Sequence, residues 1–136
     1  MDKIYSELAD AAIRARESAY SPYSGITVGA ALLSESGKIY RGANVENASY
    51  SLTICAERSA FAAAISDGER GFSAIAIAGG QGGYAVASQF PPCGACRQVM
   101  AEFCKPDFKV VLVNENGYTV HDLSDLLPLG FNGKYL

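Results

Sequence analysis

The sequence predicts an α/β fold, a three-layer α/β/α sandwich around a five-stranded mixed sheet. Helix-like and strand-like patterns alternate along the 136 residues in the order α β β α β α β β α, and such alternation is typical of a layered α/β domain. Residues 72–78 form an apolar run with few charges, as expected for a strand covered on both faces. With 49% hydrophobic and 18% charged residues, the composition is that of one globular domain, which we assign to residues 1–136.

The first half of the chain predicts a helix followed by a hairpin. Apolar residues recur at helical spacing over 3–19, and Pro and Gly then end the helix. Two strand-like runs, 26–33 and 38–43, flank a four-residue turn at 34–37 and form the hairpin. Residues 44–53 are rich in Asn and Ser and lack periodicity, so we expect a loop there.

The second half of the chain predicts two helices at the centre of the fold. Alanines with one Phe and one Ile indicate a short, largely buried helix over 56–66. The strand 72–78 leads into a glycine-rich segment, 79–83, which we expect to be a flexible loop, and the next helix covers 94–104. Two strands and a last helix complete the prediction, at 108–113, 118–120 and 122–127.

Charge and cysteine content narrow the function. The chain has 11 basic and 14 acidic residues, a net charge of −3, and its scattered basic residues argue against nucleic-acid binding. No apolar stretch is long enough to span a membrane, and the first residues lack the layout of a signal peptide. We therefore expect a cytoplasmic protein without a membrane partner. Thiols stay reduced there, so the four cysteines are better explained as ligands, catalysts or core residues than as disulfides.

Three cysteines fall where the two central helices are predicted to begin. Cys55 precedes one helix, and Cys93 and Cys96 form a Cys-x-x-Cys pair at the start of the next. A helix N-terminus lowers the pKa of a thiol, and three soft ligands favour tetrahedral zinc with one open position, as in catalytic sites. Glu57, two residues after Cys55, has the residue type and position to exchange protons with a metal-bound water.

Charge balance assigns a role to Arg58. Three thiolates on one Zn²⁺ leave a formal charge of −1, which weakens the pull of the metal on a bound water. Two helix N-termini offset part of that charge. Arg58 would offset more by donating hydrogen bonds to the cysteine sulfurs, and it would then tune the metal rather than bind substrate.

The order of these residues matches the signature of the zinc deaminases. That signature is a His or Cys, one residue, a Glu, and later Pro-Cys-x-x-Cys; here it is Cys55-Ala56-Glu57 and Pro92-Cys93-Gly94-Ala95-Cys96. A lone Cys-x-x-Cys would be weak evidence, whereas the composite is specific. The sequence closely resembles the small, homotetrameric, zinc-dependent cytidine deaminases of the cytidine/deoxycytidylate deaminase family. The stretches that carry the resemblance are 18–24, 28–32, 44–48, 54–58, 92–99 and 126–128.

The resemblance implies which residues hold a nucleoside. Asn44 and Glu46 match the family's Asn-x-Glu, which holds the ribose 3′-hydroxyl. Ala48 and Tyr50 match loop residues that reach the nucleoside of a neighbouring subunit. Phe131, shortly after Leu-Leu-Pro, matches a Phe that enters the pocket of another subunit.

Two further positions belong to the implied substrate site. Ala56 stands between the first zinc ligand and the catalytic glutamate. Ile26 occupies the position, two residues before Val28, where the family usually has a Phe that packs on the pyrimidine. An Ile covers the base with apolar surface but does not stack on it. We expect the reaction to survive this departure, which leaves base affinity and substrate range as the open properties.

The activity implied is the zinc-dependent hydrolytic deamination of cytidine and 2′-deoxycytidine to uridine and 2′-deoxyuridine, a step of pyrimidine salvage. One Zn²⁺ per subunit lowers the pKa of a bound water to roughly 7. The water attacks C4, Glu57 passes one of its protons to N3, and Glu57 then relays a second proton to the amine, which leaves as ammonia. The expected assembly is a homotetramer with shared active sites.

Three other functions fit parts of the pattern. A thiol–disulfide oxidoreductase would use Cys93 and Cys96 as a redox pair, but it leaves Cys55 and Glu57 without roles. A non-enzymatic module with structural zinc needs a fourth protein ligand. Neither Cys104, which we expect to be a buried helix residue, nor the single histidine, expected at the surface or as a cap after a strand, is placed to be that ligand. The third alternative is a deaminase for another aminopyrimidine nucleoside, such as blasticidin S.

Overall fold

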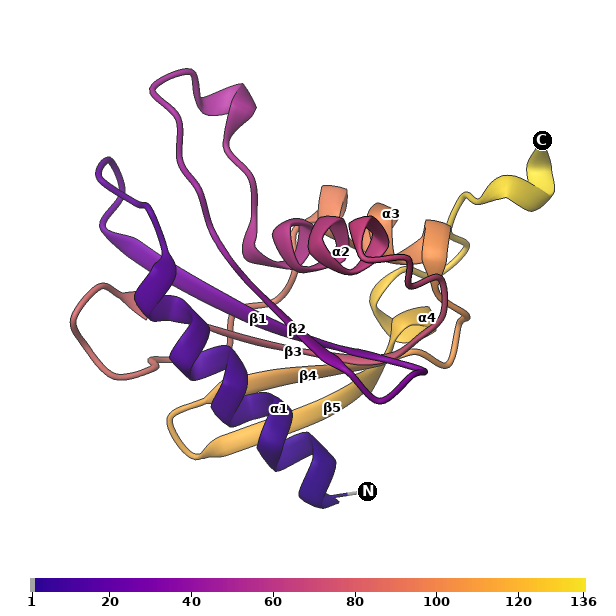
Figure 1. Ribbon diagram of the computed structural model, residues 1–136, viewed down its shortest axis with the longest axis horizontal. Coiled ribbons are helices and arrows are strands. Elements are labelled where there is room, and N and C mark those ends of the chain that lie inside the picture. The colour runs from indigo at the N-terminus through magenta and orange to yellow at the C-terminus, as the bar shows by residue number, and fades with distance from the viewer. Residues whose placement is uncertain (1) are drawn as a thin grey trace.

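The computed structural model describes residues 2–136, in which a mixed sheet is covered by helices on both faces (Figure 1). The helices are α1 (Asp2–Ala15), α2 (Ala56–Ser66), α3 (Gly94–Phe103) and α4 (Leu123–Leu126). The strands are β1 (Ile26–Ser34), β2 (Ile39–Ala43), β3 (Phe72–Gln81), β4 (Lys109–Asn114) and β5 (Gly117–Asp122). Single 3₁₀ turns are formed by Arg16–Ser18, Tyr50–Leu52 and Gly133–Tyr135.

The topology of the sheet includes one parallel pair of strands, which is connected through a helix. Within residues 2–136 the five strands are ordered β2-β1-β3-β4-β5, with β3 and β4 parallel and the other neighbours antiparallel. A parallel pair needs a crossover connection, and here that connection contains α3. The mixed five-stranded sheet is therefore confirmed.

Two cores separate the three layers. Helix α1 covers one face, where small residues such as Ala12, Ala31 and Ala76 are buried together. Helices α2 and α3 cover the other face over a bulkier core that includes Phe61 and Ile75. Strand residues alternate between the two cores, as the two-residue period of a strand requires. Among residues 2–136, no helix combines the length and apolarity needed to cross a bilayer.

Several element boundaries differ from the sequence prediction. The first helix ends at Ala15 and continues only as a 3₁₀ turn, and the last helix is four residues long. His121 lies inside β5, opposite Val110, rather than after the strand. The largest difference is in β3, which continues to Gln81 through two buried glycines that were expected in a flexible loop. Glycine here permits close packing instead of flexibility.

One close contact fixes the start of α2. A Cβ on Gly42 of β2 would lie 2.4 Å from the Ala56 carbonyl oxygen and 2.4 Å from the Ala60 nitrogen. The first turn of α2 therefore rests directly on the backbone of β2, which only a glycine at this position allows. The contact holds the beginning of α2 against the sheet and so positions Cys55 and Glu57.

Candidate active site

Three thiols converge at the starts of α2 and α3. Cys55 is the residue before α2, Cys93 is the residue before α3, and Cys96 lies in the first turn of α3. The Sγ atoms of Cys55 and Cys93 are 3.8 Å apart, those of Cys93 and Cys96 are 3.5 Å apart, and all three lie within 4.8 Å of one another. The predicted ligand set is thus assembled from two segments separated by 38 residues.

The spacing of the thiols fits a zinc ion. Two sulfurs bound to one tetrahedral Zn²⁺ at about 2.3 Å lie roughly 3.8 Å apart, close to the separations of Cys93 from its two neighbours. A set of three sulfurs favours a soft metal over Mg²⁺ or Ca²⁺. None of the cysteines within residues 2–136 is in a disulfide, so the thiols are free to ligate.

The electrostatics of the metal corner, formed by Cys55, Cys93, Cys96 and Glu57, favour a thiolate at Cys55. Helices α2 and α3, of 11 and 10 residues, both direct their N-terminal ends at this corner. The Arg58 guanidinium donates to the Cys55 Sγ at 3.5 Å. The pKa of Cys55 is lowered to about 5, first because the Cys96 thiol donates a hydrogen bond to it and further through Arg58, against an opposing effect of burial. The pKa of Cys96 is raised, because its thiol is the donor in that pair and is buried.

Glu57 is buried beside the thiols. Its side chain is only 4% exposed, and burial raises the pKa of its carboxyl to about 7, with the Cys55 charge acting in the same direction. A carboxyl group with this pKa both accepts and donates a proton near neutral pH, which is the property a proton shuttle requires.

A cavity of about 210 Å³ opens onto Glu57, Cys55 and Cys93. Its polar groups are few, and most of its wall is apolar, which is typical of a small-molecule site. Five of its lining residues were predicted from the sequence: Asn44, Cys55, Ala56, Glu57 and Cys93. Six lining residues were not predicted: Val28, Thr53, Ile54, Ile77, Phe90 and Pro91.

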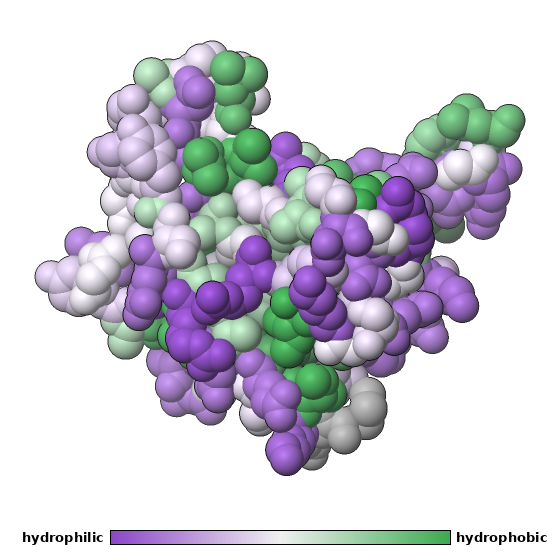
Figure 2. Space-filling view, in the orientation of Figure 1, coloured by the Kyte–Doolittle hydropathy of each residue, from purple (hydrophilic) through white to green (hydrophobic). Residues whose placement is uncertain are grey.

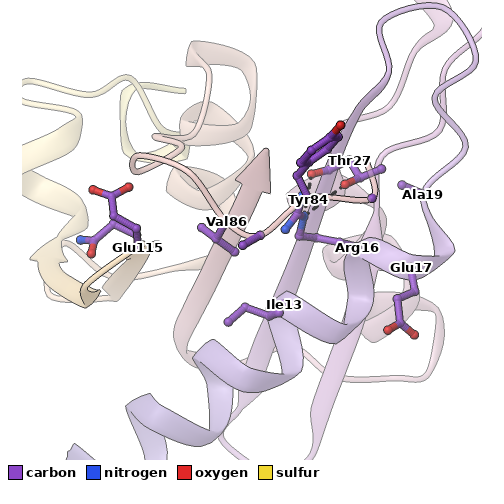
Figure 3. A pocket seen from close by; sticks show the side chains of 11 residues that line it. Ile13, Arg16, Glu17, Ala19, Thr27, Tyr84, Val86 and Glu115 are labelled. Atoms are coloured by element: carbon purple, nitrogen blue, oxygen red, sulfur yellow. Dashed lines mark hydrogen bonds between the residues drawn. The ribbon is translucent and has the colours of Figure 1, made fainter. Parts of the chain in front are cut away.

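A larger cavity, about 660 Å³, lies between the end of α1 and the loop after β3 (Figure 3). Arg16 on its wall is only 8% exposed and donates to the Thr27 carbonyl and hydroxyl and to the Gln81 carbonyl. Glu115 stands on the opposite side, away from Arg16. Arg16 thus joins α1 to β1 and β3, and the cysteine cluster lies outside this cavity.

The predicted ribose residues are both held in place by hydrogen bonds. The Asn44 Oδ1 accepts from the Val28 backbone, and its Nδ2 donates to the Ile26 carbonyl, each at 2.9 Å. The Glu46 carboxylate accepts from the Ser24 hydroxyl at 2.5 Å and from two backbone N–H groups. These bonds lower the pKa of Glu46 and keep it ionised. Glu46 itself lies outside the cavity wall.

The other predicted substrate residues also lie outside that wall. Ile26 is half-buried and lies two residues before Val28 on β1, so its side chain is on the same face of the sheet as Val28, which lines the cavity. Ala48 and Tyr50 lie on the arm formed by residues 45–54, and Tyr50 is 68% exposed. Phe131 lies on the C-terminal tail, is 56% exposed and stacks on Tyr135. One chain therefore brings together the metal ligands and Glu57, but not these four positions.

Cys104 and His121 stand apart from the cluster. Cys104 ends α3, packs against the core, and has its pKa raised to about 12 by burial. It is half-buried at the end of the helix rather than fully buried within it. The His121 ring is hydrogen-bonded to Thr119 on β5. Neither residue belongs to the group that could hold a metal.

Fold and site together define a zinc-dependent hydrolase of the deaminase type, and comparison with known proteins identifies the family. Residues 2–113 match the family model described as the cytidine and deoxycytidylate deaminase zinc-binding region. The chain therefore belongs to the cytidine and deoxycytidylate deaminase family, as the resemblance implied. Membership favours zinc chemistry over the thiol–disulfide exchange that the Cys-x-x-Cys pair alone would permit.

Similar proteins match along nearly the whole chain. A cytidine deaminase of Halalkalibacterium halodurans is 52% identical over 124 residues, covering 90% of each protein. One of Sporosarcina psychrophila is 54% identical over 124 residues, covering 90% of this chain and 88% of that protein. The crystal structure of cytidine deaminase from Burkholderia pseudomallei superposes with a TM-score of 0.84 at 48% identity, covering 92% of this chain and 97% of the other. The predicted fold is thereby confirmed.

Proposed function

We propose that this protein catalyses the hydrolytic deamination of cytidine and 2′-deoxycytidine to uridine and 2′-deoxyuridine with release of ammonia, a step of pyrimidine salvage. One observation carries the proposal. In a chain of the deaminase family, a buried glutamate and the thiols at two helix starts lie beside the same small, mostly apolar cavity.

Cys55, Cys93 and Cys96 would hold one zinc ion per subunit. When bound, the metal supplies Lewis acidity, which makes a water molecule a good nucleophile at neutral pH. Three protein ligands leave one coordination position for that chemistry. Arg58, 3.5 Å from the Cys55 sulfur, and the two helix N-termini offset the negative charge of the three thiolates.

Glu57 transfers the protons of the reaction. Replacing the amino group by oxygen consumes one water, whose protons must reach ring N3 and the departing amine. Glu57 accepts a proton from the attacking water, donates it to N3, and later relays another to the nitrogen that leaves as ammonia. With its pKa raised to about 7 by burial, one carboxyl group serves both as base and as acid.

The remaining predicted residues bind the nucleoside. Asn44 lines the cavity next to the glutamate, and its amide retains capacity for one more hydrogen bond at each polar atom. Glu46 lies outside the cavity wall and is fixed by its hydrogen bonds to residues 23–24; its ionised carboxylate would supply a hydrogen-bond acceptor to the nucleoside. Both would hold the ribose 3′-hydroxyl, and the backbone of Ala56 would border the base.

The working assembly proposed is a homotetramer with shared active sites. Tyr50, Leu52, Phe131 and Leu136 leave more than half of their area exposed, and apolar surface gathers on the projecting arm and on the tail (Figure 2). Such surface is typical of contacts between copies of a chain. In the assembly Ala48, Tyr50 and Phe131 would close the cavities of neighbouring subunits. We place the protein in the cytoplasm, where the ligand thiols stay reduced.

The direct test is product formation by the zinc-loaded protein. Cytidine and 2′-deoxycytidine should each yield the matching uridine nucleoside and one equivalent of ammonia, and removal of zinc with a chelator should stop the reaction until zinc is restored. Adenosine, whose amino group is on a purine, serves as the control for base specificity. Zinc-loaded protein that leaves both cytosine nucleosides unchanged would contradict the proposal.

A further inference from the structure

The ring of Phe90 lies flat over Gly79 on the cavity face of the sheet. An ideal Cβ on Gly79 would be 2.6 Å from the Phe90 Cγ and 2.9 Å from both Cδ atoms. This Cβ position is equally distant from both Cδ atoms and only slightly nearer to Cγ. With ring bonds of about 1.4 Å, such a position lies above the face of the ring rather than beyond its edge. The ring therefore packs face-on against the backbone of β3.

Gly79 provides the space for this ring. It pairs with Val28 in the regular ladder between β1 and β3, and its backbone does not adopt the positive φ that favours glycine. Any side chain at position 79 would overlap the Phe90 ring. A glycine in a buried, paired strand has no side chain to pack and costs more conformational entropy on folding. At position 79 the packing of the Phe90 ring against the backbone offsets that cost.

Phe90 faces the same cavity as the catalytic groups. It lines the cavity together with Glu57, Cys55 and Cys93. It also stands three residues before Cys93, joined to it by Pro91 and the buried Pro92. Two prolines restrict the backbone between them, so the position of the ring is tied to the metal corner.

The neighbouring position on β1 lacks an aromatic side chain. Ile26 and Val28 face the cavity side of the sheet, and their partners on β3 are Gln81 and Gly79. Of these, Val28 lines the cavity and Ile26 does not. Phe90 is the one aromatic side chain among the described lining residues of this cavity.

We propose that Phe90 is a specificity-determining residue, whose ring forms the wall against which the planar aminopyrimidine packs. This proposal rests on the proposed function and concerns the base, so it applies alike to ribosides and deoxyribosides of cytosine. Aromatic contacts of this kind change affinity by about 3–10-fold. Because Glu57 and the thiols are untouched, loss of the ring should act on KM and leave kcat nearly unchanged.

The test compares zinc-loaded wild type with Phe90→Leu, Phe90→Tyr and, as matched control, Phe103→Leu on the far end of α3. We expect Phe90→Leu to raise KM for cytidine and 2′-deoxycytidine by about 3–10-fold, with kcat within about twofold and full zinc content. Phe90→Tyr should keep the wild-type KM, because it retains the ring. The double variant Ile26→Phe/Phe90→Leu should recover part of the lost affinity by presenting a ring from β1.

Three results would overturn the proposal. One is an unchanged KM in Phe90→Leu, and another is an equal rise in Phe103→Leu. The third is a loss of zinc in Phe90→Leu, which would show that the ring acts through the metal corner. If Phe90→Leu fails to fold, the fallback is an NMR measurement on Glu57→Gln protein with bound cytidine. Magnetisation transfer between the Phe90 ring and the cytidine H5 and H6 protons would support the packing of the ring against the base, and its absence would contradict that packing. A wild type that fails to convert cytidine would instead contradict the proposed function itself.

Discussion

The metal corner and the two exposed segments of the chain, an arm and the C-terminal tail, are built in opposite ways. At the corner, Cys96 is 1% exposed and Glu57 is 4% exposed, and both lie in helices packed against the sheet. On the arm of residues 45–54 and the tail of residues 127–136, Tyr50 is 68% exposed and Phe131 is 56% exposed. The aromatic contacts of these two segments lie away from the buried cores: Tyr50 meets Tyr23 in the turn before β1, and Phe131 meets Tyr135.

The difference separates two requirements of catalysis. Bond-making groups must be held within a fraction of an ångström, and rigid helix starts provide this within one chain. Enclosure of the substrate needs mostly apolar surface, and copies of the same chain can supply it through a symmetric assembly. Changes at the corner should therefore abolish chemistry, whereas changes on the arm and tail should weaken substrate binding.

The largest effect is expected from loss of a metal ligand. Cys96→Ala should lower zinc content to near zero and activity by more than roughly 10³-fold, because the Lewis acid is lost with its third thiolate. Cys104→Ala is the matched control, since that thiol ends the same helix outside the cluster. Zinc analysis and turnover on the same samples check the prediction, and zinc retained at wild-type affinity in Cys96→Ala would contradict it.

Removing the proton shuttle should act on chemistry alone. Glu57→Gln keeps the size and burial of the side chain, so zinc should remain bound while kcat falls by about 10²–10⁴-fold. Glu102→Gln, an exposed glutamate of α3, should behave as wild type. Near-normal turnover in Glu57→Gln would exclude this carboxyl as the proton carrier.

A smaller effect is expected where charge is balanced around the thiols. Arg58→Gln removes the donor to the Cys55 sulfur and should weaken zinc binding by about 10–100-fold in competition with a chelator. Arg14→Gln, on the exposed side of α1, controls for the change in net charge. Equal zinc affinity in both variants would separate Arg58 from the metal.

The smallest effect should occur far from both regions, at the end of α2. The Tyr40 hydroxyl donates to Asp67 and is the largest cause of the lowered pKa of that carboxyl group. The pKa of Glu69 is lowered mainly by hydrogen bonds from Ser34 and Ser36, and further by Tyr40. The contribution of the two carboxyl groups is present above the usual pKa values of 3.8 and 4.5 and is lost as pH falls through the lowered values of the folded state. Tyr40→Phe should therefore lower Tm by about 1–3 °C at pH 6 and by less at pH 3. A Tm difference that grows in acid would contradict this assignment.

Local patterns were sufficient for the metal corner. Cys55, Glu57, Cys93 and Cys96 were placed from their spacing and from the helix starts beside them, and the structure brings these residues together. Helical and strand periods also predicted the layers, because each face of the sheet buries its own set of side chains.

Contacts between distant segments could not be inferred from the sequence. Gly79 indicated a loop, whereas β3 continues through it, paired with Val28 and with the Phe90 ring packed against its backbone. The hydrogen bonds of Asn44 to β1 likewise depend on how the arm leaves the sheet. The closure of the cavity by Tyr50 and Phe131 requires other copies of the chain, so it stays a proposal.

The most direct test of the account is to mix two defective variants. It asks whether the catalytic groups come from one chain while the residues that close the cavity come from a neighbouring chain. Glu57→Gln lacks the proton carrier, and Phe131→Ala lacks the side chain lent to a neighbour. Co-refolded in equal amounts, they should form tetramers in which about a quarter of the sites combine an intact Glu57 with an intact Phe131. The account predicts that the mixture then exceeds the summed kcat/KM of the separate variants. Activity equal to that sum, in mixtures shown by mass to have exchanged subunits, would contradict it.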